Sequence, residues 1–158
     1  MFNNIFVEKT VLIIKPEAVA KESEISNALL KFGFNIINRR KVHLTPEVAS
    51  DFYREFIEET LFFNLIEAIT CGPCVIYCLA RKSAVHFLKQ LVGPADVVMA
   101  KRTNPDCLRA IYGLDRLRNG LHASSNRESS DRELRFFFSS NLIIEPLMNK
   151  LETEDYLE

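Results

Sequence analysis

The sequence lacks the features of proteins that are inserted into membranes or exported. No apolar run approaches the roughly 18 residues that a membrane-spanning helix needs, and the N-terminus has no charged segment followed by an apolar one. The chain also shows no internal repeat, low-complexity tract or linker. We therefore expect an intracellular, cytoplasmic protein with no membrane partner.

A large excess of charge of either sign is also missing. With 20 Lys and Arg against 21 Asp and Glu, the net charge is -1 at pH 7. No overall basic field would attract nucleic acid, so we expect no nucleic-acid partner. The 158 residues, 47% of them hydrophobic, have the size and composition of one globular domain. We expect that domain at residues 1–140 and a C-terminal tail, rich in acidic residues, at 141–158.

Cysteine is scarce, but three of the four cysteines stand close together, and CGPC at 71–74 matches the motif of thioredoxin-type redox proteins. That chemistry needs the first cysteine at a helix N-terminus, where the helix dipole lowers the thiol pKa. Here β-branched and aromatic residues at 75–79 predict a strand instead. We expect a turn into a buried strand, with redox chemistry as the alternative. Without a secretory signal, a disulfide framework is not expected.

Strands and helices alternate along the chain. Short apolar or β-branched runs predict strands, and apolar residues repeated every three or four positions predict helices. The predicted strands cover 10–14, 35–44, 74–80 and 120–123. The predicted helices cover 22–34, 45–59, 62–70, 82–92, 105–112 and 127–137, with irregular chain at 94–104. This order predicts an α+β fold, the ferredoxin-like βαββαβ sandwich, in which helices cover a four-stranded antiparallel sheet.

Several polar residues fall at the ends of these elements, where core packing does not explain them. They comprise cations, a phenol and an amide around an imidazole: Lys15, Tyr53, Lys89, Arg109, Asn119 and His122. Cations and hydrogen-bond donors together suggest a polyphosphate site. Each residue also has a structural alternative, as a solvated strand end, a helix cap or a half-buried aromatic.

The last predicted helix adds a possible partner for the histidine. Leu134, Phe137 and Phe138 mark its apolar side, and Glu133 borders that side, from which its carboxylate can reach the His122 ring. A ring nitrogen that donates to a carboxylate leaves the other nitrogen unprotonated and nucleophilic. Our hypothesis is that His122 is a nucleophile oriented by Glu133. The alternative is a histidine with a purely structural role.

Several segments together resemble the nucleoside diphosphate kinases. They are VLIIKPEAV, FYREF followed by LFFNLI, CGPCVIYCL, LRAIYG and RNGLHASSNRESSDRE, and the resemblance runs from about Glu8 to Phe138. The last segment is similar to the family signature Asn-x-x-His-Gly-Ser-Asp. The resemblance implies transfer of the γ-phosphate from a nucleoside triphosphate such as ATP to a nucleoside diphosphate, through a phosphohistidine. It also implies magnesium held by the nucleotide phosphates rather than by protein ligands, and a homodimer or larger assembly.

The resemblance assigns a role to each candidate residue. His122 would be the nucleophile, Glu133 would hold its other ring nitrogen, and Ser124 would match the signature serine beside the histidine. The nucleotide would be bound by the remaining candidates, with Phe62 stacking on the base: Lys15, Tyr53, Phe62, Lys89, Arg109 and Asn119.

The chain departs from the family pattern around the phosphates. Lys89 stands where the family usually has Arg, Ala95 replaces a phosphate-binding Thr, and Ala123 replaces the Gly after the histidine. Arg116 occupies a position where a small apolar residue is common, and the segment 93–109 is longer than usual. The motifs look closest to a divergent branch found in ciliary axonemes. Two functions stay open: an active kinase, or a nucleotide-binding scaffold with axonemal protein partners in a cilium or flagellum.

Overall fold

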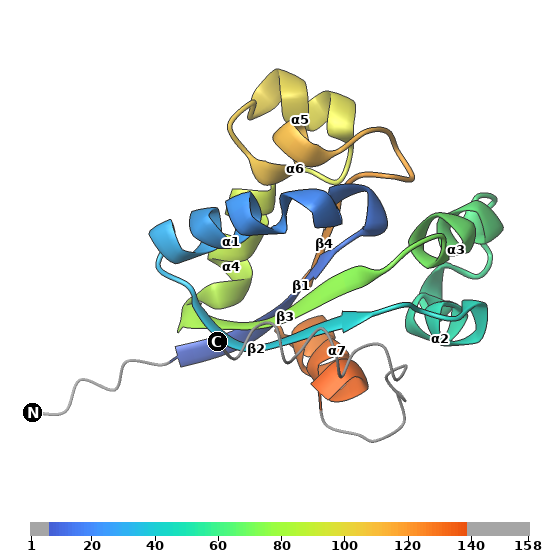
Figure 1. Ribbon diagram of the computed structural model, residues 1–158, viewed down its shortest axis with the longest axis horizontal. Helices are drawn as coiled ribbons and strands as arrows, with labels where there is room; N and C mark the ends of the chain where they lie inside the picture. Colours follow the sequence, from blue (N-terminus) through green and yellow to red (C-terminus); the bar gives the residue numbers. More distant parts are fainter. Residues whose placement is uncertain (1–6, 139–158) are drawn as a thin grey trace, which may run out of the picture.

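A computed structural model describes residues 7–138 (Figure 1). Within them, four strands form one antiparallel sheet in the order β2-β3-β1-β4. The strands are β1 (Val7–Ile14), β2 (Asn35–Val42), β3 (Cys74–Lys82) and β4 (Leu121–Ala123). The predicted ferredoxin-like α+β sandwich is confirmed. The predicted tail at 141–158 lies outside the described residues.

Helices cover both faces of this sheet (Figure 1). The α-helices are α1 (Glu22–Lys31), α2 (Pro46–Phe52), α3 (Phe62–Thr70), α4 (Ala84–Val92), α5 (Val97–Thr103), α6 (Leu108–Tyr112) and α7 (Arg127–Phe138). Two 3-10 helices, η1 (Pro16–Lys21) and η2 (Arg54–Phe56), complete the set. Across the described part of the chain, no helix has the length and apolar character to cross a membrane.

The continuous apolar run in β1 follows from burial on both faces. Side chains alternate across a strand, so Leu12 and Ile14 pack in the cluster that includes residues of α1 and α4. Val11 and Ile13 pack in the cluster formed with α2, α3 and α7. All four are fully buried. β1 is thus a central strand, and its packing on both faces fixes the position of the residues that follow Ile14.

The helix predicted at 45–59 is shorter in the structure. It begins as predicted, with the Thr45 hydroxyl accepting a hydrogen bond from the Val48 N–H (3.2 Å) and Pro46 in the first turn. It ends at Phe52 and gives way to η2. Phe56 and Ile57 are 38% and 59% exposed, so a longer helix would have gained little apolar burial on this side.

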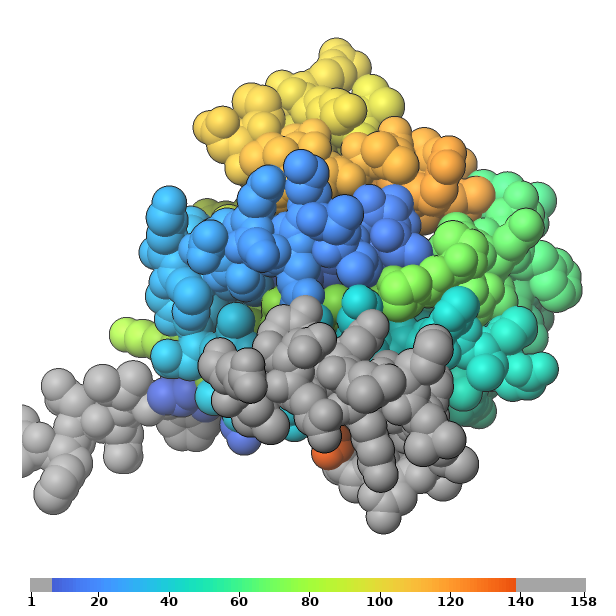
Figure 2. All heavy atoms as spheres, in the orientation of Figure 1, coloured from blue at the N-terminus to red at the C-terminus, as the bar shows by residue number. Residues whose placement is uncertain are grey.

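Residues 94–104, predicted to be irregular, contain the helix α5. The Asp96 carboxylate caps it by accepting a hydrogen bond from the Met99 N–H (3.1 Å), and Val97 and Ala100 are buried. The helix has 7 residues, too few to show a clear apolar period in the sequence. With α6 it forms the yellow-to-orange projection at the top of Figure 2.

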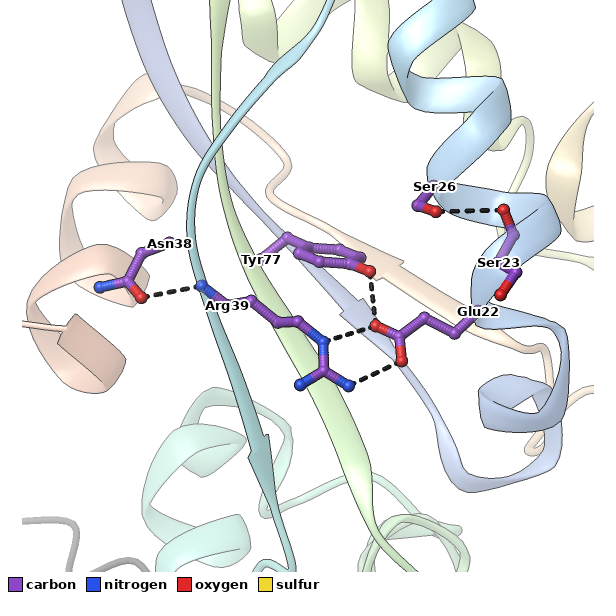
Figure 3. A network of polar contacts seen from close by, with 6 residues as sticks. All are labelled: Glu22, Ser23, Ser26, Asn38, Arg39 and Tyr77. Carbon is purple, nitrogen blue, oxygen red and sulfur yellow. Dashed lines mark hydrogen bonds and ion pairs between the residues drawn. The ribbon is translucent and has the colours of Figure 1, made fainter. Parts of the chain in front are cut away.

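A polar network ties α1 to the sheet (Figure 3). The Glu22 carboxylate accepts two hydrogen bonds from the Arg39 guanidinium (both 2.7 Å) and one from the Tyr77 hydroxyl (2.5 Å). Burial raises the pKa of Glu22, but the Arg39 and Tyr77 contacts outweigh it, and the net pKa is below its ordinary value. The network is a satisfied structural contact between α1, β2 and β3.

Candidate functional site

A pocket of about 560 Å³ gathers polar residues from segments that are far apart in the sequence. Its walls come from the end of β1, from α4, α6 and α7, and from the loop and strand around β4. Seven predicted site residues line it: Lys15, Tyr53, Lys89, Arg109, Asn119, His122 and Glu133. The structure thus brings together residues from position 15 to position 133.

The end of β1 organises one wall of the pocket. The Lys15 N–H donates to the Gly120 carbonyl (2.9 Å), and Lys15 Nζ donates to Asn119 Oδ1 (2.8 Å). The Glu17 carboxylate accepts from the Gly120 N–H (2.9 Å). Gly120 has φ +86°, a conformation that favours glycine. Glu17 was not among the predicted residues, although its place two residues after Lys15 was a usable signal.

Two cations are buried beside each other in this wall. Burial lowers the pKa of Lys15, the Glu17 charge raises it and the Arg109 charge lowers it, and the net pKa is about 8. Burial lowers the pKa of Arg109 to about 10. The Arg109 guanidinium donates to the carbonyls of Gly93 (2.8 Å), Pro94 (2.9 Å) and Leu121 (2.6 Å). Arg109 therefore fastens the segment after α4 to β4 while its charge stays at the pocket.

Three further side chains present hydrogen-bond donors. The Tyr53 hydroxyl is buried without a hydrogen-bond partner among the described residues, and burial raises its pKa, so it is a neutral donor. Lys89 Nζ donates to the Ser125 carbonyl (3.0 Å). Asn119 Nδ2 donates to the Ala95 carbonyl (3.3 Å). The pocket is therefore rich in donors, as an anion site requires.

His122 lies on β4, opposite Ile13 of β1 in the antiparallel register. Its ring Nε2 is hydrogen-bonded to Oε1 of Glu133, which is 1% exposed and comes from α7. Burial raises the pKa of Glu133, but the hydrogen bond and charge of His122 outweigh it, with a smaller effect from Ser124, so the net pKa is below its ordinary value. An ionised carboxylate can only accept a hydrogen bond, so Nε2 carries the hydrogen, and in the neutral imidazole Nδ1 then has the free lone pair.

Aromatic rings hold the imidazole in this orientation. The Phe52 and Tyr53 rings meet it edge to face, with centroids 5.4 Å and 6.1 Å away. Ser124 is fully buried and lies behind the pocket, near Glu133, instead of in the pocket wall. His122 is therefore fixed by strand pairing, by Glu133 and by two rings.

Phe62 is the one predicted site residue that faces a different pocket. It is 3% exposed and lines a neighbouring pocket of about 520 Å³. Phe56 and Leu65 line both pockets, so the two adjoin. Further residues that the sequence did not single out also line the first pocket: Glu55, Phe56, Leu65, Ser129 and Arg132. Of these, Arg132 had a signal, since it directly precedes Glu133.

The site does not offer a metal-binding cluster of its own. Within residues 7–138, no group of three or more His, Cys, Asp or Glu side chains could hold a metal ion. Glu55 and Glu133 line the pocket, and Glu133 is bound to His122. A magnesium ion at this site would therefore have to be held mainly by phosphate oxygens.

The four cysteines are free thiols. Cys71 is exposed, and Cys74 is the first residue of the buried strand β3. The redox motif needs its first cysteine at a helix N-terminus, but Cys71 is the C-cap of α3, where the helix dipole disfavours a thiolate. Burial also raises the pKa of Cys74 to about 12. The CGPC segment is therefore a turn into a strand in this structure.

Comparisons with known proteins identify the family of the chain. The model of the nucleoside diphosphate kinase family matches residues 8–143. Nucleoside diphosphate kinase homolog 5 of Mus musculus is 48% identical over 97% of this chain and 72% of its own length, and that of Homo sapiens is 46% identical over the same shares. The crystal structure of the Aquifex aeolicus nucleoside diphosphate kinase matches with a TM-score of 0.81 and 34% identity, over 87% of this chain and 99% of that one. The chain belongs to the nucleoside diphosphate kinase family, and within it resembles the homolog 5 branch.

Proposed function

We propose that this protein is a nucleoside diphosphate kinase that works through a phosphohistidine at His122. The observation that carries this proposal is the His122–Glu133 pair at the wall of a donor-rich pocket. Glu133 occupies Nε2 and leaves Nδ1 free to attack. A nucleophile oriented by a hydrogen-bonded partner is the arrangement that covalent catalysis uses.

The reaction has two half-reactions at the same site. In the first, Nδ1 of His122 attacks the γ-phosphorus of a nucleoside triphosphate, the N–P bond forms, and the bond to the β-phosphate oxygen breaks. The nucleoside diphosphate leaves with the electron pair of that bond. In the second, a terminal oxygen of another nucleoside diphosphate attacks the phosphorus and the N–P bond breaks. The ring keeps its Nε2 hydrogen, and Glu133 keeps its charge, throughout both steps.

The remaining pocket residues neutralise and position the phosphates. Phosphoryl transfer depends mainly on alignment and on neutralisation of charge at the phosphoryl oxygens. Lys15, Lys89 and Arg109 supply positive charge, and the unpartnered Tyr53 hydroxyl and the Asn119 amide supply hydrogen bonds. Magnesium enters as part of the substrate, bound to the nucleotide phosphates, and adds further neutralising charge there.

We also propose a homodimer or larger assembly, and a place in the cytoplasm or in a cilium. Both follow from the family resemblance and its axonemal branch. The competing function, a nucleotide-binding scaffold of an axoneme, draws its support from the altered phosphate contacts at Lys89, Ala95 and Ala123. A native mass measurement tests the assembly, and a monomer would contradict it.

Phosphoenzyme formation tests the catalytic proposal. The protein is incubated with ATP labelled at the γ-phosphate, and the label is followed in acid and in alkali. We expect an acid-labile, alkali-stable phosphoprotein that loses its label when a nucleoside diphosphate is added. His122→Ala should take up no label, and His86→Ala is the matched control, because His86 is exposed on α4 outside this pocket. Absence of label from the wild-type protein would favour the scaffold.

A further inference from the structure

The pocket beside the candidate site combines an apolar lining with two charged groups of opposite sign. Phe62, Leu65 and Leu117 contribute apolar surface, and Glu59 and Arg116 contribute the charges. Phe62 is buried, whereas Glu59 and Arg116 are exposed. Apolar surface beside directional polar groups is the usual composition of a site for a flat, polar-edged ligand.

Arg116 has no competing partner within residues 7–138. Its neighbour Arg118 forms the ion pair with Asp115, from Nη2 (2.6 Å) and Nε (3.0 Å) to Oδ2. The other Asp115 oxygen accepts the backbone N–H groups of Leu117 and Arg118. Among residues 7–138, the Arg116 guanidinium makes no hydrogen bond, ion pair or ring contact.

The Glu59 carboxylate likewise has no partner in the described part of the chain. Its side chain forms no hydrogen bond or ion pair with any residue that the structure describes, including Arg116. Two opposite charges that line one pocket without pairing are both available to a ligand. The ligand they fit carries hydrogen-bond acceptors on one edge and donors on another.

The nucleobase is the part of the substrate that reaches this pocket. This step rests on the proposed function, which places the phosphates beside Lys15 and His122 in the first pocket. Since Phe56 and Leu65 line both pockets, a nucleotide with its phosphates in the first can extend its base into the second. Phe62 then offers the apolar ring contact that a base prefers.

Guanine matches the two free charges better than adenine does. Its O6 and N7 form an edge of two acceptors that an arginine fork binds with two hydrogen bonds. Its N1–H and N2–H₂ groups are donors that a carboxylate can accept. Adenine instead presents an N6–H₂ donor beside N7, which a guanidinium cannot pair with twice. We propose that Arg116 and Glu59 make this protein selective for guanine nucleotides.

Binding of GDP and ADP to wild-type protein and to variants tests this selectivity by calorimetry. We expect the wild-type protein to bind GDP about tenfold more tightly than ADP, near the lower end of what one bidentate arginine–guanine contact contributes. Arg116→Ala should abolish the preference, and Glu59→Ala should lower GDP affinity more than ADP affinity. Arg116→Lys keeps the charge but loses the fork, so it should lose most of the preference. Arg102→Ala, which removes an exposed cation from α5, should keep it.

The possible outcomes separate this inference from the proposed function. Equal affinity of wild-type protein for GDP and ADP, or a preference for ADP, contradicts the proposed guanine selectivity. Neither result contradicts the proposed kinase function. If Arg116→Ala weakens the binding of GDP and of ADP by the same factor, Arg116 acts only through its charge on the phosphates. The proposed guanine selectivity is then wrong. If no nucleotide binds, the proposed function fails as well.

Discussion

Two polar clusters in this molecule differ in how completely they are satisfied. Around Glu22, both carboxylate oxygens accept hydrogen bonds, from Arg39 and from Tyr77 (Figure 3). Around His122, only part of the hydrogen-bonding capacity is used. Glu133 Oε2 and the buried Tyr53 hydroxyl have no hydrogen-bond partner within residues 7–138.

This difference in hydrogen bonding distinguishes a structural contact from a candidate functional site. A buried polar group without a partner costs on the order of 1–3 kcal/mol, so such groups are rare and call for an explanation. The Glu22 cluster joins α1 to two strands and opens to no candidate site. The His122 cluster lines a pocket, and the residues that carry its unpartnered groups, Tyr53 and Glu133, are among the lining residues. We expect substitutions to change stability in the first cluster and turnover in the second.

The largest expected effect is at His122. His122→Ala should reduce phosphoryl transfer to background, because it removes the ring nitrogen to which we expect the phosphoryl group to be attached. The melting temperature should also fall somewhat, because the variant leaves the buried Glu133 carboxylate without its imidazole partner. Turnover per folded molecule, measured with a coupled assay, checks this. Unchanged turnover in the variant would mean that His122 has a structural role, like the residues around Glu22.

Glu133→Gln should have the next largest effect. The amide keeps the shape but weakens the charge-assisted hydrogen bond that orients the ring. A loss on the order of 2 kcal/mol corresponds to a roughly tenfold to hundredfold lower rate. The rate of phosphoenzyme formation in a single turnover measures it. A variant that melts earlier but turns over normally would show that Glu133 only supports the fold.

Lys15 should make nucleotide binding dependent on pH. Because burial lowers its pKa to about 8 in the free protein, Lys15 loses its positive charge as the pH rises through that value. Bound phosphates favour the protonated form, so affinity should fall above pH about 8, by up to about tenfold per pH unit. In Lys15→Met, affinity should be weaker at pH 7 and this decline should be absent. An identical decline in both proteins would assign it to another group.

Tyr77→Phe should affect stability and leave catalysis unchanged. It removes one hydrogen bond to the Glu22 carboxylate, which should lower the free energy of unfolding by about 1–2 kcal/mol. Denaturant unfolding measures that change, and turnover per folded molecule should match the wild type. Lower turnover with unchanged stability would mean that the two clusters are coupled.

The smallest effect is expected at the cysteines. Replacement of both Cys71 and Cys74 by Ser should leave turnover insensitive to reductant, as in the wild type, because both are free thiols and burial raises the pKa of Cys74. A thiol titration checks the pKa directly. An unusually acidic thiol at either position would restore the redox alternative.

The sequence predicted the sheet well because its two central strands, β1 and β3, are buried over most of their length. The apolar run of β1, followed by Lys15 and Pro16, indicated both the strand and its end. The donation of a ring nitrogen of His122 to Glu133 was expected from the apolar side of α7, and the structure contains that hydrogen bond. Local apolar patterns carry this information because they decide which face of each element is buried.

Other features depend on long-range contacts that no local pattern encodes. The α2 helix ends at Phe52, and the chain continues through η2 to Phe56 and Ile57, which stay largely exposed. The α5 helix forms with two buried residues and an N-cap at Asp96. Phe62 faces the second pocket, which depends on the path of the chain between η2 and α3. The Glu22 network joins three elements, so its members looked like ordinary surface residues in the sequence.

The position of the phosphate on the His122 ring tests the central claim most directly. If Glu133 holds Nε2, the phosphoryl group must be attached to Nδ1. Wild-type protein is phosphorylated with ATP, and the attachment site is read by nuclear magnetic resonance of phosphorus-31 and nitrogen-15 in histidine-labelled protein. We predict the Nδ1 phosphohistidine. Phosphate on Nε2, or on a residue other than His122, would contradict the account.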